Sequence, residues 1–276
     1  MNDKTHMGLL PTGLADILPP EAEFEAYITE VLMNSFAKYG YDRVKPPLIE
    51  FEDILLSGSG SNMAKQTFRM MDPISQRMLG VRADMTLQIA RIASTRLGDI
   101  KRPIRLSYAG QVLRVKGSNL RPKRQFGQIG VELVGSPSPK ADSEIILMAA
   151  DALSNLGIKN LSIDLCLPTL VPAICKSHKI DSTTIVNRLR VALDEKDKPA
   201  VEILEKELGE GTNSVFSSLL EAVGPVDKAL KNLKKINLPK NAATELSHLS
   251  DVISCLKRQT PDLTITIDPV ETRGYK

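Results

Sequence analysis

Apolar residues in the first part of the chain alternate between helical and strand-like spacing. They recur at helical spacing from Glu21 to Tyr39, and Gly40 stands where such a helix would end. A strand-like run to Pro47 and a flexible loop at 57–61 follow. The further elements expected are a hairpin of Phe68–Asp72 and Arg77–Asp84, a helix from Thr86 to Leu97, strands Ile104–Lys116 and Gln125–Val134, a helix over Asp142–Leu156 and a strand Leu161–Leu167. This alternation predicts an α/β or α+β domain on a largely antiparallel sheet.

The pattern changes after Pro172, where amphipathic helical patterns follow one another up to residue 258 with no convincing strand. The expected helices are Ser182–Asp194, Pro199–Leu208, Ser214–Val223, Val226–Leu233 and Ala242–Leu256. Leu263–Ile267 then resumes as a strand of the first domain, which makes the helical region an insertion. The expected segments are a core at 1–176, a helical insertion at 177–260 and a return to the core at 261–276. The abrupt end after Arg273 suggests a truncated chain.

Composition and charge narrow the functional classes. The chain is 42% hydrophobic and 25% charged, as in ordinary globular proteins, and a net charge of +3 gives no general attraction for nucleic acid. The longest apolar stretches are too short to span a bilayer and no apolar leader opens the chain, so we expect a cytoplasmic protein without a membrane partner. The three cysteines lack C-x-x-C spacing and the three histidines lie far apart, so neither a disulfide framework nor a metal site is expected.

Polar residues recur with strand periodicity in three of the expected strands. Because side chains alternate across a strand, each strand presents one polar side. These sides consist of Arg82, Asp84 and Thr86, of Gln128, Gly130 and Glu132, and of Arg114 and Lys116. A sheet with one solvated face accounts for this pattern. The alternative is an amino-acid pocket, in which the acidic side chains take an ammonium and an imidazole N–H and an arginine takes a carboxylate, each contributing about 1.5–3 kcal/mol.

A basic run without acidic residues extends from Lys101 to Arg124. Such a run is typical of a solvated or partner-facing surface, and contact with phosphate or nucleic acid is the competing account. Tyr108 and Phe126 are its only nearby aromatic residues, which weakens a model in which single-stranded bases stack on the protein. Gly58 and Gly60 lack the strand–loop–helix context of a phosphate-binding loop. We therefore do not expect nucleic acid as a partner.

Several segments, taken in order, resemble histidyl-tRNA synthetases. They are Pro11–Pro19 at the opening, the helix and strand up to Pro47 as class II motif 1, Gly80–Thr86 as the histidine-binding R-P-E-x-T segment, Leu113–Lys116 with Arg124–Glu132 as motif 2 and its trailing strand, and Asp268–Tyr275 as the start of the second histidine-specific motif. The resemblance implies an α+β fold, with a class II synthetase-like antiparallel sheet flanked by helices and a helical insertion. It also implies a homodimer formed through the motif 1 region.

The departures from that family concern ATP. The motif 2 glutamate that contacts ATP is Lys116 here, and this replacement reverses both the hydrogen-bonding role and the charge. Gly117, Ser118 and Gly127 replace an arginine, a proline and a histidine of the family pattern, and motif 3 and the anticodon-binding domain are missing. The positions that the resemblance assigns to free histidine persist: Asp84, Thr86, Arg114, Gln128, Glu132 and Arg273.

Loss of the ATP contacts with retention of the amino-acid contacts resembles the regulatory subunits of ATP phosphoribosyltransferase, which are synthetase paralogues. The resemblance implies a non-catalytic chain without cofactor or catalytic residues. Such a chain joins a catalytic phosphoribosyltransferase subunit in a hetero-oligomer, and it is required for the first step of histidine biosynthesis and for feedback inhibition by histidine, the expected effector. A divergent or fragmentary histidyl-tRNA synthetase is the alternative; truncation explains a missing motif 3 but not the internal Lys116. The third hypothesis is an RNA-binding module that uses the basic run from Lys101 to Arg124.

Overall fold

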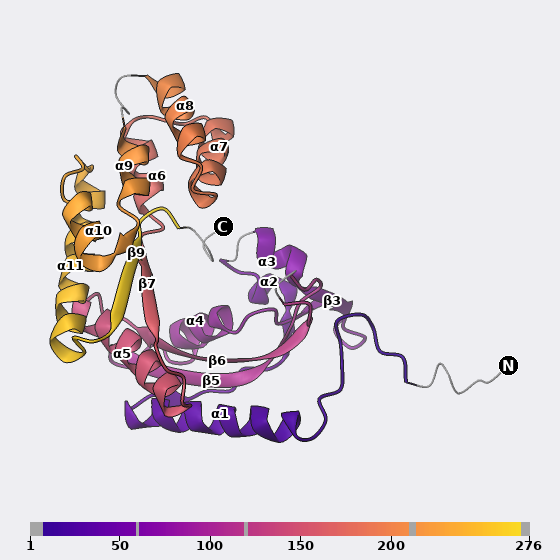
Figure 1. Cartoon of the computed structure of the whole chain (residues 1–276). Coiled ribbons are helices and arrows are strands. Elements are labelled where there is room, and N and C mark those ends of the chain that lie inside the picture. The colour runs from indigo at the N-terminus through magenta and orange to yellow at the C-terminus, as the bar shows by residue number, and fades with distance from the viewer. Residues whose placement is uncertain (1–7, 59–60, 119–120, 210–213, 272–276) are drawn as a thin grey trace. The chain divides into compact units, whose positions relative to one another are not determined.

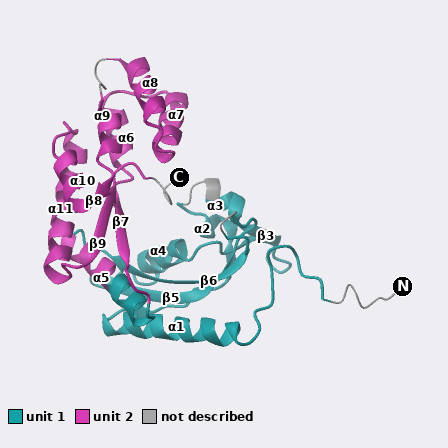
Figure 2. Cartoon of the chain, in the orientation of Figure 1, with its two compact units in different colours: residues 1–137, 148–157 teal, residues 138–147, 158–276 magenta. Residues whose placement is uncertain are grey.

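The computed structural model describes residues 8–58, 61–118, 121–209 and 214–271, which form two compact units (Figure 2). Unit 1 contains residues 1–137 and 148–157, and unit 2 contains residues 138–147 and 158–276. Helix α5 (Pro139–Asn155) contributes residues to both. These boundaries differ from the expected segments 1–176, 177–260 and 261–276, which remain a prediction about the domains.

The main sheet of unit 1 is built on the long antiparallel pair of β5 (Ile104–Leu113) and β6 (Gln125–Val134) (Figure 1). The short strand β1 (Asp42–Arg43) pairs with β5 in parallel. The register places Tyr108 opposite Gly130 and Leu106 opposite Glu132. The antiparallel pairing expected from the sequence is confirmed, but β5 ends at Leu113, three residues earlier than expected. Arg114 and Lys116 therefore lie beyond the strand, where alternation along it no longer sorts them onto one side.

Two helices cover the two faces of this sheet. Helix α1 (Glu21–Lys38) packs against β5 and β6, and its Glu25 Oε1 accepts a hydrogen bond of 3.1 Å from Gln111 Nε2. Helix α4 (Thr86–Thr95) contributes Ile89 and Ala93 to a buried cluster with Ile104, Leu106, Tyr108 and Val112. The helical spacing read from the sequence is confirmed for both helices, because each turns one apolar stripe to the sheet.

A second sheet of unit 1 has the strand order β2 (Ile49–Phe51), β4 (Met78–Val81), β3 (Phe68–Met71), and β3 and β4 form the expected hairpin. Strand β4 ends at Val81, so the expected strand through Asp84 is wrong at its end. Helix α4 begins at Thr86, where the expected helix begins. The short helices α2 (Glu52–Leu55) and α3 (Ser61–Gln66) were not expected, because elements of this length span too few turns to show a period.

Unit 2 contains a sheet in which β9 (Thr264–Asp268) runs parallel to β7 (Ser162–Cys166). The helices between these strands are α6 (Leu170–Ser177), α7 (Thr183–Asp194), α8 (Lys198–Leu208), α9 (Val215–Glu221), α10 (Val226–Leu233) and α11 (Lys240–Gln259). The expected run of helices between two strands is thus confirmed, although α6 was missed, and its status as an insertion into the first domain remains a prediction. The two-residue strand β8 (Gly224–Pro225) pairs with β9 and corrects the expectation that the helical region holds no strand.

None of the helices in the described parts of the chain combines the length and apolar character that a bilayer crossing requires.

Candidate functional site

Polar residues expected at the ligand site lie close together between the end of β4 and the start of α4, beside β6. They include Asp84, Thr86 and Gln128. Asp84 Oδ1 accepts a hydrogen bond of 2.8 Å from the backbone N–H of Thr86. Gln128 Oε1 accepts one of 2.9 Å from the N–H of Met85, and Gln128 Nε2 donates to Asp84 Oδ2 at 3.1 Å. The first amides of a helix have no partner within the helix, so side-chain acceptors stabilise its start. Asp84 and Gln128 therefore fix the beginning of α4 and one another.

Tyr108 joins Glu132 to this group. Its hydroxyl donates to Glu132 Oε1 at 3.2 Å and lies 3.3 Å from Thr86 Oγ1. The Tyr108 side chain comes from β5 and is buried, whereas Glu132 on β6 is half-buried. Asp84 and Gln128 thus form one hydrogen-bonded group, and Tyr108 and Glu132 form another. Thr86 contacts both groups, because its backbone N–H binds Asp84 and its hydroxyl lies beside that of Tyr108.

Burial governs the ionisation of these groups. Burial raises the pKa of the Glu132 carboxyl, hydrogen bonds with Thr86 and Tyr108 oppose that rise, and the charge of Asp84 adds to it. Burial also raises the pKa of Tyr108 to about 12, so its hydroxyl remains a proton donor at neutral pH. Because the charge of Asp84 acts on Glu132, the two carboxylates together favour a ligand that brings a positive charge and N–H donors.

Arg114 lies beside this group. Its Nε is 3.3 Å from the carbonyl oxygen of Ala83, the residue before Asp84, and its guanidinium carbon is 5.1 Å from the centroid of the Phe126 ring. The guanidinium retains further N–H donors with which it can bind a carboxylate. Arg273, the remaining residue expected at the site, lies outside the described residues.

Arg82 has a different role from its neighbours Asp84 and Thr86, with which the sequence pattern grouped it. Its side chain is buried and donates to the carbonyls of Gln111 at 2.8 Å and Pro46 at 3.0 Å, and burial lowers its pKa. The guanidinium lies so close to Gly110 that a Cβ there would be 2.3 Å from Nη2. The Arg82 side chain is therefore used in buried contacts with backbone carbonyls and is not available to a ligand.

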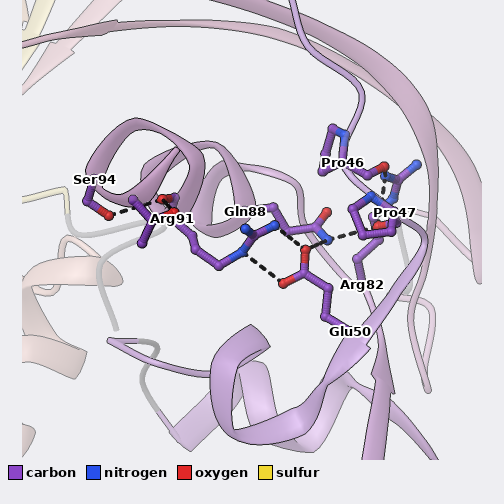
Figure 3. Close-up of polar contacts among 8 residues, drawn as sticks. Pro46, Pro47, Glu50, Arg82, Gln88, Arg91 and Ser94 are labelled. Carbon is purple, nitrogen blue, oxygen red and sulfur yellow. Dashed lines mark hydrogen bonds and ion pairs between the residues drawn. The ribbon is translucent and has the colours of Figure 1, made fainter. Parts of the chain in front are cut away.

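A buried polar cluster continues from Arg82 and anchors α4 (Figure 3). Gln88 Nε2 donates to the Pro47 carbonyl at 2.9 Å and to Glu50 Oε1 at 2.8 Å, while Arg91 Nε donates to Glu50 Oε2 at 3.0 Å. The Glu50 side chain is 9% exposed. These bonds attach the helix to the segment that follows β1, and so they hold the first turn of α4 in place for Thr86.

Lys116 is exposed and follows the end of β5. The backbone of Pro122 lies close to Gly117, where a Cβ would be 2.4 Å from the Pro122 carbonyl oxygen. The arginine of the family pattern cannot be placed at Gly117 without moving this backbone. In the described part of the chain, no group of three or more His, Cys, Asp and Glu side chains is arranged to hold a metal ion.

Tyr108 is the residue that sequence reasoning missed. It was read only as one aromatic residue within the basic run. Its partner Gly130 was placed on the polar side of its strand, but the pairing of the two follows from the strand register, which the sequence pattern does not fix.

The fold and the polar site together define a class II synthetase-like protein. A family model described as histidyl-tRNA synthetase matches residues 13–276. A structure titled ATP phosphoribosyltransferase regulatory subunit/histidyl-tRNA synthetase, from Bacillus halodurans, superposes with a TM-score of 0.84 at 24% identity, covering 96% of this chain and 69% of that one. The chain in an ATP phosphoribosyl transferase (HisG:HisZ) complex from Thermotoga maritima gives a TM-score of 0.65 at 16% identity, covering 90% and 82%. At these identities the likeness shows the fold.

Sequence similarity identifies the branch within this class. The ATP phosphoribosyltransferase regulatory subunit of Paramagnetospirillum magneticum is 52% identical over 276 residues, which are 100% of this chain and 72% of the relative. The chain therefore belongs to the family of ATP phosphoribosyltransferase regulatory subunits.

Proposed function

We propose that this chain is a non-catalytic subunit that assembles with a catalytic phosphoribosyltransferase subunit. In that complex it is required for the first step of histidine biosynthesis and for its inhibition by histidine. The family membership supports this role, and the fold is shared with a chain of the Thermotoga complex. Histidine regulates in this scheme only by binding two states of the complex with unequal affinity, because equal affinity shifts no equilibrium.

We further propose that histidine binds at the junction of β4 and α4. Asp84 and Thr86 hold the ammonium group, and Glu132 accepts an N–H of the imidazole. Arg114 and the second N–H of Gln128 hold the carboxylate, together with Arg273 by resemblance. The hydrogen-bond capacity supports this assignment, because both carboxylates keep unused lone pairs and Gln128 uses one of its two N–H donors.

One observation carries the proposal: residues assigned to histidine are connected by hydrogen bonds, whereas the exposed cation Lys116 stands where the family resemblance places a glutamate that contacts ATP. A lysine can neither accept the hydrogen bonds of the family glutamate nor reproduce its charge. This combination favours sensing of histidine over its activation with ATP.

The motif 1 region supports a homodimer within the assembly. Helix α1 exposes Phe24 to 64% and Tyr27 to 58%, and exposed aromatic residues of this size are typical of protein interfaces. Replacing both by glutamate is expected to convert dimers to monomers in sedimentation velocity. Unchanged dimers would move the interface elsewhere.

Reconstitution with the catalytic subunit tests the main proposal. We expect phosphoribosyltransferase activity to require this chain, histidine to inhibit it, and the Glu132→Ala variant to support activity that histidine no longer inhibits. Calorimetric titration of the isolated chain should show histidine binding that the variant lacks. Lys116→Ala is the matched control outside the site and should behave as wild type. Histidine-dependent pyrophosphate exchange by the wild type would contradict the proposal and indicate a ligase.

A further inference from the structure

The turn between β3 and β4 is closed by several hydrogen bonds although its tip is apolar. Asp72 Oδ1 accepts from the backbone N–H of Ile74 at 3.1 Å, and Asp72 Oδ2 accepts from that of Ser75 at 3.2 Å. The Asp72 N–H donates to the Arg77 carbonyl at 2.9 Å, and the Gln76 N–H donates to the Asp72 carbonyl at 2.9 Å. These bonds hold Ile74 in a turn, where polar residues, glycine and proline are usual, with 92% of the residue exposed.

Exposed methionines stand on both faces of the hairpin next to this turn. Met71 and Met78 are paired across β3 and β4, and they are 56% and 40% exposed. Met70 is 42% exposed and lies on the opposite face from Met71, because side chains alternate along a strand. Single exposed apolar residues are ordinary, but neighbouring ones mark interaction sites. Met70, Met71, Ile74 and Met78 are called the hairpin surface below.

Charged side chains tie the hairpin to β2 and α2. Arg77 Nη2 lies 3.1 Å from Asp53 Oδ2, and the Arg77 guanidinium carbon is 3.6 Å from the centroid of the Phe51 ring. Arg69 Nε of β3 lies 3.0 Å from Glu52 Oε1. A hairpin that is already held in place loses less conformational entropy when it binds, and methionine is enriched at protein interfaces.

The arrangement of the hairpin surface selects the kind of partner. One opposing flat face would cover one face of the hairpin and leave the methionine on the other face in water. A concave site covers both faces and the tip together. Because the four residues carry no charge, the walls of that site must be apolar to repay the loss of water contacts.

The hairpin is connected directly to the proposed histidine site. Val81, the last residue of β4, lies three residues before Asp84. Strand β2, which pairs with β4, carries Glu50, whose carboxylate accepts from Gln88 and Arg91 of α4. A subunit that responds to histidine must contact a part of this chain that the ligand can bias. The hairpin meets that condition, whereas the exposed aromatic residues of α1 are assigned to contacts between copies.

We propose that the hairpin surface inserts into an apolar cleft of the catalytic phosphoribosyltransferase subunit. Ile74 is the central anchor, and the flexible methionine side chains fill the cleft on either side of it. This inference rests on the proposed function, since it assumes that the two subunits associate, and it adds the surface that makes the contact.

Calorimetric titration of the catalytic subunit into the full chain tests the inference. Ile74→Asp places a charge on the anchor and should weaken association by about 30-fold or more, the effect typical of a central interface residue. The turn uses the backbone N–H of residue 74, so the variant should keep its fold. Met71→Ser removes apolar contact area and should weaken association by about 3- to 10-fold.

Ile100→Asp is the matched control. Ile100 is an exposed isoleucine of the same unit, outside the hairpin, and the same charge there should leave association unchanged. The isolated Ile74→Asp chain should bind histidine as the wild type does, because residue 74 is not assigned to the pocket. Equal weakening by the aspartates at positions 74 and 100 would show that the added charge, not the hairpin surface, is responsible, and would overturn the inference.

The remaining outcomes separate the inference from the proposed function. Wild-type association by both Ile74→Asp and Met71→Ser would overturn the inference alone. If Ile74→Asp changed self-association in sedimentation velocity and left binding of the catalytic subunit unchanged, the hairpin surface would be a contact between copies and the inference would be wrong. If the wild type did not bind the catalytic subunit, the proposed function would fall and the inference with it.

Discussion

Glu132 shows how a residue assigned to the proposed histidine site can lower the stability of the folded state. Its carboxyl, on β6, is half-buried, and burial raises its pKa. A raised pKa means that the folded chain holds the proton more tightly than the unfolded chain. The corresponding stability is fully present below the unfolded pKa and is lost as pH rises through the folded pKa. At neutral pH the ionised Glu132 therefore lowers the free energy of unfolding.

Replacement of Glu132 by glutamine should separate stability from binding. The amide is uncharged and can still accept from Tyr108, so we expect a higher melting temperature at pH 7.5, an unchanged one near pH 4, and lost affinity for histidine. Thermal unfolding followed by circular dichroism at the two pH values measures the effect. Glu221→Gln is a control of opposite sign, because Lys198 lowers the pKa of that exposed carboxyl. A Glu132→Gln variant less stable than wild type at pH 7.5 would contradict this account.

Individual residues of the site were predictable to different degrees. Asp84, Thr86, Gln128 and Glu132 could be selected from residue type, spacing and family resemblance, and the structure brings them into one hydrogen-bonded group; their role toward histidine stays a prediction. Strand alternation failed for Arg82 because β4 ends at Val81. Beyond a strand, local turns decide where a side chain points, and these depend on tertiary contacts.

Elements with several turns of amphipathic pattern were predicted well, and short ones were not. The bounds of α10 (Val226–Leu233) agree with the expected helix, and those of α7 and α8 differ by one residue at the start, since each buries one stripe of apolar residues. Helices α2 and α3 and strand β8 were missed because two to six residues carry too little periodicity. Such elements form where neighbouring structure satisfies their backbone.

Helix α9 illustrates stabilisation by a distant side chain. Glu205 of α8 is buried and accepts from the backbone amides of Phe216 at 2.7 Å and Ser217 at 3.1 Å, in the first turn of α9. Removing the Glu205 carboxylate leaves the buried amides of Phe216 and Ser217 without this acceptor. Glu205→Ala should therefore lower the free energy of unfolding by about 2–4 kcal/mol. Urea unfolding monitored by far-UV circular dichroism measures the loss.

Glu205→Gln keeps an acceptor and should lose less than Glu205→Ala. The control Glu202→Ala removes an exposed carboxylate on the same helix, 3.9 Å from Lys198, and should change the free energy of unfolding by less than about 0.5 kcal/mol. Equal losses for the alanine variants at 202 and 205 would show that the cap contributes nothing.

At the scale of the whole molecule, regulation requires that histidine binding and subunit association influence each other equally. If the complex binds histidine with a different affinity from the free chain, histidine must change the affinity between subunits by the same factor. We expect a factor of about 5–150, measured by titrating the catalytic subunit into this chain with and without saturating histidine. The Glu132→Ala variant should give a factor of one. A histidine effect on association that persists in that variant would place the effector site elsewhere.

The sequence by itself determined the elements with repeated apolar periodicity and the run of helices between two strands. Only by resemblance to the synthetases does Lys116 stand where that family has an ATP-binding glutamate. These are local properties, because residue type and spacing along one segment suffice to read them. Only the tertiary structure decided that Tyr108 lies over Gly130, that Arg82 is buried against backbone carbonyls, and that Asp84 and Gln128 cap the same helix. Apart from the bond between Asp84 and Thr86, each of these contacts joins residues at least 22 apart in sequence, and such contacts are set by strand register and by packing between elements.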